Sequence, residues 1–252
     1  MRVSIIGSGN VATHIAKALR NANVTLLNIW SYNLENAQIL ANKVDAVAVA
    51  EIAQINTEDS DIVLISVKDD AIATVASQLV NYSGLIAHTS GAVTIDALSN
   101  HKNYGVFYPL QTFSKHKELD FSNVPLCLEA NDTSNLDSLK HLAKLISKNF
   151  YEVDSEQRKT LHLAAVFACN FPNYLYGVAQ QLLAQNHLDF DIIKPLITET
   201  ANKIQTALPM EVQTGPAVRN DEQTLKKHEG MLQEHPEWLT IYKLLSEQIK
   251  KG

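Results

Sequence analysis

The stretch RVSIIGSGNVA, residues 2–12, contains a short apolar run followed by the pattern G-x-G-x-x-A. In a dinucleotide-binding fold the first glycine permits a tight turn, and the second lets the backbone approach a pyrophosphate. The alanine lets the next helix pack closely on the strand, and the N-terminus of that helix attracts phosphate. We therefore predict a strand, turn and helix that bind a dinucleotide through Gly7, Ser8, Gly9, Asn10, Val11 and Ala12.

Strand and helix patterns alternate from residue 1 to about residue 154. The run at 61–67 is apolar and β-branched, as expected of a buried parallel strand, and Asp70 is predicted to cap the helix after it. Alternation of this kind predicts an α/β Rossmann domain over residues 1–154, with a doubly wound, mainly parallel sheet. Further strands are predicted at 24–30, 46–49, 84–88, 104–108, 124–129 and 150–153.

Strand patterns vanish after Asp154, and helical patterns follow at 156–185, 191–207, 221–233 and 236–250. This predicts an all-helical domain over residues 155–252, with a kink at Pro172. Residues 161–171 are apolar nearly all round, and such a helix must be covered on every side. We therefore expect a homodimer formed through the helical domain, and a small-molecule substrate in a cleft between the two domains.

Composition narrows the class of protein further. The chain has 252 residues, a net charge of −6 and no block of lysine and arginine, which argues against nucleic acid or anionic membrane as a partner. The first strand pattern begins at residue 2, and no apolar run is long enough to span a bilayer. Cys127 and Cys169 are interpreted as reduced core residues rather than a disulfide or a metal site. The prediction is a cytoplasmic protein without a metal.

Several motifs in this order resemble one set of Rossmann-like proteins whose C-terminal helical domain has no known function. The motifs are GSGNVA at 7–12, the run at 61–67, HTSG at 88–91, PLQTF at 109–113, and TGPA at 214–217 with Arg219, Asp221, Thr224 and His228. The resemblance covers nearly the whole chain and implies an NAD(P)-dependent oxidoreductase. The architecture is similar to pyrroline-5-carboxylate reductase, 3-hydroxyacid dehydrogenases and deazaflavin-dependent NADP oxidoreductases.

The chain departs from these relatives at four positions. Lys68 stands where many have proline, and Tyr108 stands where histidine commonly precedes the proline. Val166 occupies the place of the catalytic lysine of 3-hydroxyacid dehydrogenases, so their mechanism does not transfer. Asn220 replaces a glycine, and its spacing to Gln223 suits a capping box.

The predicted second strand ends without a carboxylate near Ser31 and Asn33. A fold that prefers NAD places Asp or Glu there to bind the ribose hydroxyls, so the sequence favours NADP, with NAD possible. Ser31 and Asn33 are predicted phosphate donors, although no arginine is present to grip the phosphate. The alternative is that both are polar residues of a solvated loop. Val67 and Lys68, after the strand at 61–67, complete the predicted cofactor residues.

The segment from His88 to Gly91 follows a strand at the edge where ligands bind in such sheets. Backbone N–H groups at Ser90 and Gly91 are predicted to hold a substrate oxygen, and His88 to donate a proton. Alternatively, His88 is a buried residue bonded to backbone. Gln111 is predicted to contact nicotinamide or substrate; otherwise it is a turn residue.

Four polar residues of the helical domain are further candidates. Asn170 and Asn173 interrupt an apolar surface and need partners, so they are predicted to bind substrate. Arg219 suits an anionic substrate, and His228 shares a helical face with Asp221. These charges alternatively form an ion-pair network between domains or subunits. His162 is interpreted as a residue of the helix surface; the alternative is that it substitutes for the lysine that Val166 replaces.

Two functions remain open from the sequence. The first is an NADP-dependent reductase or dehydrogenase of a small anionic carbonyl, imine or hydroxy compound, with a proton supplied by His88, His228 or Tyr108. The second is a sensor or regulatory protein that binds NAD(P) or another nucleotide without turnover.

Overall fold

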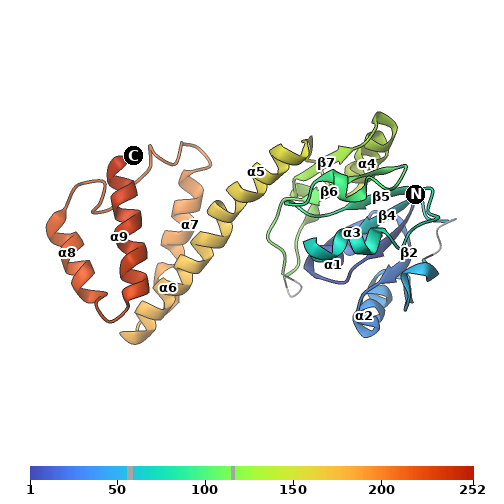
Figure 1. Ribbon diagram of the computed structural model, residues 1–252. Helices are drawn as coiled ribbons and strands as arrows, with labels where there is room; N and C mark the ends of the chain where they lie inside the picture. Colours follow the sequence, from blue (N-terminus) through green and yellow to red (C-terminus); the bar gives the residue numbers. More distant parts are fainter. Residues whose placement is uncertain (56–58, 115–116) are drawn as a thin grey trace. The chain divides into compact units, whose positions relative to one another are not determined.

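The computed structural model describes residues 1–55, 59–114 and 117–252. The chain forms two compact units, Met1–Cys169 and Asn170–Gly252 (Figure 1). The predicted boundary after residue 154 coincides with the start of helix α5 (Ser155–Ala165). The first compact unit extends beyond this boundary because Arg158 and Leu161 of α5 pack against the residues of the sheet domain.

The first unit contains an eight-stranded sheet in the order β3-β2-β1-β4-β5-β6-β7-β8. Adjacent strands are parallel except β6 and β7, which are antiparallel. This topology confirms the predicted doubly wound, mainly parallel sheet. The strands are β1 (Arg2–Ile6), β2 (Thr25–Trp30), β3 (Val47–Val49), β4 (Ile62–Ile65), β5 (Leu85–His88), β6 (Tyr104–Pro109), β7 (Leu126–Ala130) and β8 (Phe150–Glu152).

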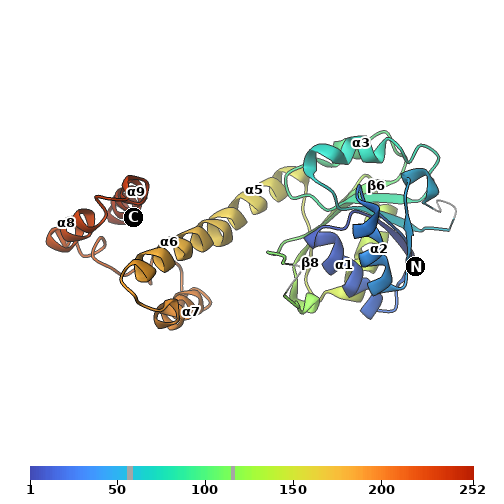
Figure 2. The ribbon, with the colours of Figure 1, turned by 90° about the horizontal axis from the view of Figure 1, so that it is seen from below.

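Helices cover both faces of this sheet because successive side chains along a strand point to opposite faces. In β4, Ile62 and Leu64 belong to one apolar cluster, and Val63 and Ile65 belong to another. Figure 2 shows α1 and α2 on the opposite side of the sheet from α3. The first face is covered by α1 (Asn10–Asn21), α2 (Leu34–Val44) and α4 (Thr133–Ile146), and the second by α3 (Ile72–Ala76).

The order of the strands creates a switch point at β1. Strand β2 pairs with one edge of β1, and β4 pairs with the other. In such sheets ligands bind outside the carboxyl ends of the strands at the switch point. Strands β5 and β6 run parallel to β4, so their carboxyl ends at His88 and Pro109 lie at the same edge.

Asp70 does not cap a helix, contrary to the prediction. Residues Asp69–Ala71 form a 3₁₀ turn, and α3 begins after it at Ile72 without a side-chain cap. The turn uses the backbone of Asp70 itself, so its carboxylate is not placed at the N-cap position.

The second unit is entirely helical. Its helices are α6 (Phe171–Gln185), α7 (Lys194–Lys203), α8 (Glu222–Met231) and α9 (Pro236–Lys251). A π-helical turn, Val166–Asn170, separates α5 from α6 at the site of the predicted kink. Pro172 lacks an N–H and crowds the preceding turn, and the wider π turn relieves both problems.

The helices leave much apolar surface uncovered within one chain. Cys127 is buried as predicted, but Cys169 is exposed, so the prediction that it is a core residue was wrong for the single chain. Cys169 lies in the π turn, where Phe167 is also exposed.

None of the helices in the described part of the chain is long and apolar enough to cross a membrane.

Candidate functional site at the carboxyl edge of the sheet

Gly7 is required by the backbone itself. Its φ of +132° lies in the region that favours glycine, and its N–H donates to the Trp30 carbonyl at 2.7 Å. A Cβ on Gly7 would overlap the backbone carbonyl of Ser66 in the loop after β4. The first glycine therefore brings the turn after β1 against the neighbouring strand.

Gly9 has a different role, because none of the residues that the structure describes occupies the space above it. A Cβ built on Gly9 meets no atom within 4 Å. Gly9 is the N-cap of α1, with no side-chain cap and no acidic residue in the first turn. The first N–H groups of α1 therefore face an open space beside a positive dipole end, and this donor set fits a pyrophosphate.

The predicted ribose region contains the hydroxyl groups of Ser8 and Ser31, and residues 28–33 include no carboxylate. Ser8 and Ser31 are hydrogen-bonded at 2.7 Å, which joins the glycine turn to the end of β2. Asn33 caps α2 by accepting from the N–H groups of Glu35 and Asn36. The carbonyl of the Asn33 side chain is thus used in the helix cap, and its amide group is the part suited to donate to a ligand.

The other predicted cofactor and loop contacts lie close by. Val67 is half-buried and Lys68 exposed, in the loop after β4. The Asn10 side chain donates to the Phe113 carbonyl at 3.0 Å, so it ties α1 to the loop after β6. In that loop Gln111 is exposed and accepts from the Thr112 N–H at 2.8 Å. The side chain of Gln111 therefore acts as a turn residue in this structure.

His88 is buried and hydrogen-bonded to the backbone, as the alternative interpretation of the sequence expected. Its side chain is fully buried; Nδ1 accepts from the Ser90 N–H at 3.2 Å, and Nε2 lies 3.3 Å from the Thr94 carbonyl. Burial, followed by the charge of Arg158, lowers the pKa of His88 from 6.5 to about 4. The ring is therefore neutral and carries its proton on Nε2. This N–H donates a hydrogen bond to the Thr94 carbonyl, which fixes the loop after β5.

Ser90 is likewise turned into the loop. Its Oγ accepts from the N–H groups of Ala92 and Val93, both at 3.1 Å. Because the Ser90 N–H is bonded to His88, it is not available for the predicted contact with a substrate oxygen. Ser90 and His88 together shape the backbone that presents Gly91.

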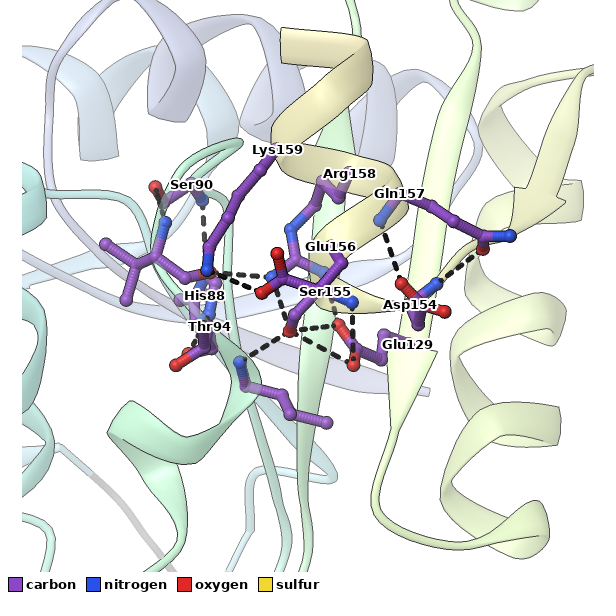
Figure 3. Close-up of polar contacts among 12 residues, drawn as sticks. His88, Ser90, Thr94, Glu129, Asp154, Ser155, Glu156, Gln157, Arg158 and Lys159 are labelled. Atoms are coloured by element: carbon purple, nitrogen blue, oxygen red, sulfur yellow. Dashed lines mark hydrogen bonds and ion pairs between the residues drawn. The ribbon is translucent and has the colours of Figure 1, made fainter. Parts of the chain in front are cut away.

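A buried arginine that the sequence analysis did not single out supports this loop (Figure 3). Arg158 is 0% exposed; it pairs with Glu129 of β7 and donates to the Val93 carbonyl at 2.6 Å. Ser155 donates to the same carboxylate at 2.9 Å and accepts from the Ile95 N–H at 3.0 Å. The cluster therefore joins α5, β7 and the loop after β5.

The position of Arg158 follows from how α5 begins. The Asp154 side chain accepts from the Gln157 N–H at 2.8 Å, and the Asp154 N–H donates to the Gln157 side chain at 3.0 Å. This capping box sets the phase of the helix, so that residues four apart share a face. Arg158 and His162 are four residues apart. This spacing was the feature of the sequence that could have placed both side chains on the same face of α5.

Tyr108 and His162 form a pair at the carboxyl edge. The Tyr108 hydroxyl lies 3.0 Å from His162 Nδ1, so His162 is not the surface residue that the sequence suggested. A Cβ on Gly91 would lie 2.7 Å from the Tyr108 ring and 2.8 Å from His162 Nδ1. The predicted Gly91 therefore lies beside Tyr108, one of the proton donors considered from the sequence, and beside His162.

The remaining candidates belong to the second unit. Asn170 and Asn173, the predicted substrate-binding amides, are exposed within the single chain. Arg219 is also exposed. In the described part of the chain, no group of three or more His, Cys, Asp or Glu side chains is placed to hold a metal ion.

The polar face of α8 stabilises the second unit. Asp221 is the N-cap and accepts from the Thr224 N–H at 3.1 Å and hydroxyl at 2.7 Å, which lowers the pKa of Asp221. His228 Nδ1 lies 2.8 Å from the Tyr242 hydroxyl of α9. Asn220 is not the cap that its spacing indicated: with φ of 54° it occupies a left-handed turn, which asparagine tolerates in place of glycine.

The burial of His88 predicts a pH dependence of stability. The pKa of His88 is lower in the folded protein than in the unfolded chain. Its contribution to the free energy of unfolding is therefore complete above pH 6.5 and is lost as the pH falls toward about 4. When the pH falls from roughly 7 to 4.5, the free energy of unfolding of the wild type should decrease by about 2–3 kcal/mol more than that of His88→Gln. Urea unfolding of both proteins across this range measures the difference, and parallel pH profiles would contradict it.

Two family models match the chain. Residues 2–98 match the coenzyme F420-dependent NADP oxidoreductases, and residues 124–249 match a domain of unknown function, DUF2520. No curated protein matches the chain significantly by sequence. A crystal structure from Bacteroides fragilis, described as a candidate NADP oxidoreductase, is 40% identical with a TM-score of 0.94. The match covers 100% of this chain and 98% of that one.

More distant structures share the fold. A reductive aminase from Aspergillus terreus, solved with NADPH and ethyl-5-oxohexanoate, is 14% identical with a TM-score of 0.73, covering 100% of this chain and 94% of that chain. A pyrroline-5-carboxylate reductase from Coxiella burnetii is 15% identical with a TM-score of 0.58, covering 99% and 98%.

The fold and the glycine turn define a Rossmann protein of the NADP oxidoreductase type. The chain belongs to the family that joins an N-terminal domain of the coenzyme F420-dependent NADP oxidoreductase type to a C-terminal DUF2520 domain. This confirms the predicted resemblance.

Proposed function

We propose that this chain is an NADP-dependent oxidoreductase that reduces a small anionic carbonyl or imine compound, or oxidises the corresponding hydroxy compound. The observation that carries the proposal is the open space above Gly9, at the uncapped N-terminus of α1 and beside the switch point at β1. Family membership supports the same class of chemistry. The proposal includes a cytoplasmic location, where thiols such as Cys127 stay reduced.

The residues of the glycine turn would hold the cofactor. The N–H groups at the start of α1 would bind the pyrophosphate, and Gly9 would let it approach the backbone. The bound nicotinamide supplies or accepts a hydride, so the protein needs few reactive side chains. The loop after β5, fixed by His88 and Arg158, would form one wall of the substrate site.

NADP is the proposed cofactor in preference to NAD. A carboxylate at the end of β2 would repel a 2′-phosphate, and residues 28–33 contain none. The hydroxyl groups of Ser8 and Ser31 and the amide group of Asn33 are donors suited to that phosphate. For the substrate, we keep Arg219 as the proposed anion-binding residue, because an exposed guanidinium binds a carboxylate bidentately.

We further propose a homodimer formed through the helical unit. In Asn170–Gly252 the buried apolar side chains are Ala217, Leu225, Leu232 and Trp238, a small core for that length. Exposed apolar side chains include Ile192, Leu196, Leu208, Met231 and Leu244. Light scattering at micromolar concentration should give twice the mass of one chain. The mass of a single chain would contradict the dimer.

A screen for turnover tests the proposed reaction. Oxo acids, imines and hydroxy acids would be added with NADP in the required redox state, and the nicotinamide absorbance followed. Turnover of one of these classes supports the proposal. Tight cofactor binding without turnover on any of them would contradict it and would favour a nucleotide-binding sensor.

A further inference from the structure

Tyr108 stands at the edge of the sheet where the proposed site lies. It is the last residue but one of β6, whose carboxyl end lies beside that of β5, and its side chain is 9% exposed. Tyr108 is therefore held in one place by the sheet, in contrast to a residue on a surface loop. The loop after β5 reaches it at Gly91.

The partner of Tyr108 is the imidazole ring of His162. His162 Nδ1 lies 3.0 Å from the Tyr108 hydroxyl, and the two rings meet edge to face with centroids 6.1 Å apart. His162 is half-buried, so part of its side chain contacts solvent. One proton can move within this pair: the Tyr108 O–H donates to a neutral Nδ1, and a protonated Nδ1–H donates to a phenolate oxygen.

The surroundings of Tyr108 favour the protonated form of its hydroxyl group. Burial and the nearby Cys127 raise the pKa of Tyr108 to about 12, and the charge of Asp69 acts in the same direction. Arg158 acts in the opposite direction. Cys127 belongs to β7, Asp69 follows β4 and Arg158 belongs to α5, so groups from three separate elements influence Tyr108.

The other predicted proton donors are engaged elsewhere. His88 is neutral and bonded at both ring nitrogens, and His228 is bonded to Tyr242 in the second unit. Tyr108 is the candidate that combines a position at the ligand edge with an imidazole partner in hydrogen-bond contact.

We propose that Tyr108, paired with His162, is the catalytic proton donor and acceptor of this site; the inference rests on the proposed function. In carbonyl reduction the new C–H bond would form with a hydride from a bound dihydronicotinamide, which would be oxidised. The Tyr108 O–H bond breaks as the substrate O–H bond forms. Protonated His162 then returns a proton to the phenolate and regains its own from solvent. His162 is a positioning and relay residue in this step.

Fluorine NMR tests the placement of Tyr108 without a substrate. The protein is labelled with 3-fluorotyrosine, and Tyr108→Phe assigns the resonance. NADP⁺ is compared with adenosine 2′,5′-bisphosphate, which lacks the nicotinamide. We expect NADP⁺ to shift the Tyr108 resonance, and the bisphosphate to leave it in place. Tyr82, whose hydroxyl is buried against the Ser60 carbonyl, is the internal control and should respond to neither.

The outcomes separate this inference from the proposed function. If calorimetry shows NADP⁺ binding and the Tyr108 resonance is unaffected, the inference is overturned and the proposed cofactor stands. If neither NADP⁺ nor NAD⁺ binds, both fail.

Kinetics test the role in proton transfer. With a carbonyl substrate from the turnover screen, Tyr108→Phe should lower kcat by roughly a hundredfold, with cofactor Kd changed less than about twofold. His162→Gln keeps a hydrogen-bonding side chain but cannot titrate, so it should lower kcat less and flatten the pH profile. An unchanged kcat in Tyr108→Phe would exclude the hydroxyl as the proton donor.

Discussion

Gly9→Val is expected to weaken NADP binding by at least about a hundredfold, or about 2.7 kcal/mol. The valine side chain would fill the space above the turn, which no residue in the described ranges occupies, and would block the pyrophosphate from the N–H groups of α1. Valine is a poor N-cap residue, so the substitution should lower the free energy of unfolding. The decrease should be at most about 1 kcal/mol, because the side chain enters open space. Calorimetric titration and urea unfolding measure the two effects.

Two other glycines provide controls for this experiment. Gly230→Val also enters open space, but in α8 of the second unit, and should leave cofactor binding unchanged. Gly7→Ala should instead impair folding, since its side chain would overlap the backbone at Ser66. Normal NADP affinity in Gly9→Val would show that the pyrophosphate does not lie on this turn.

Arg158→Met should lower the free energy of unfolding by about 3–5 kcal/mol. The substitution leaves the Glu129 carboxylate, which is 15% exposed, without its buried cation. It also removes the donor to the Val93 carbonyl that holds the loop after β5. Urea unfolding monitored by circular dichroism gives the magnitude.

The neighbouring lysine is a matched control. Lys159 pairs with Glu156 on the exposed side of the same helix, so Lys159→Met should change stability by less than about 0.5 kcal/mol. In the double variant Glu129→Leu with Arg158→Met, no charge is left buried without a partner, so the loss should be smaller than in Arg158→Met alone. A loss below about 1 kcal/mol in Arg158→Met would show that the cluster does not hold the loop.

The fold was predictable because its determinants are local. The β-branched run at 61–67 and the glycine turn after β1 each specify a strand or a turn from adjacent residues. Alternation of strands and helices then leaves few topologies. The helix breaks were less predictable: the π turn at Val166–Asn170 and the short α3 depend on how the chain packs.

The site was predictable only in part, because it depends on residues far apart in the sequence. The glycine turn carries its own chemistry, and its geometry agrees with the pattern. Tyr108 and His162 are 54 residues apart, and Glu129 and Arg158 are 29 apart, so no local pattern pairs them. His88 was interpreted from its residue type, whereas burial determines its protonation state.

Calorimetric titration of the unmodified protein with NADP⁺ and with NAD⁺ tests the central claim most directly. We expect saturable binding of NADP⁺ at one site per chain, and weaker binding of NAD⁺, because the end of β2 offers hydroxyl donors and no carboxylate. Tighter binding of NAD⁺ would overturn the preference. Absence of binding of either cofactor at millimolar concentration would contradict the claim that the turn after β1 is a nicotinamide cofactor site.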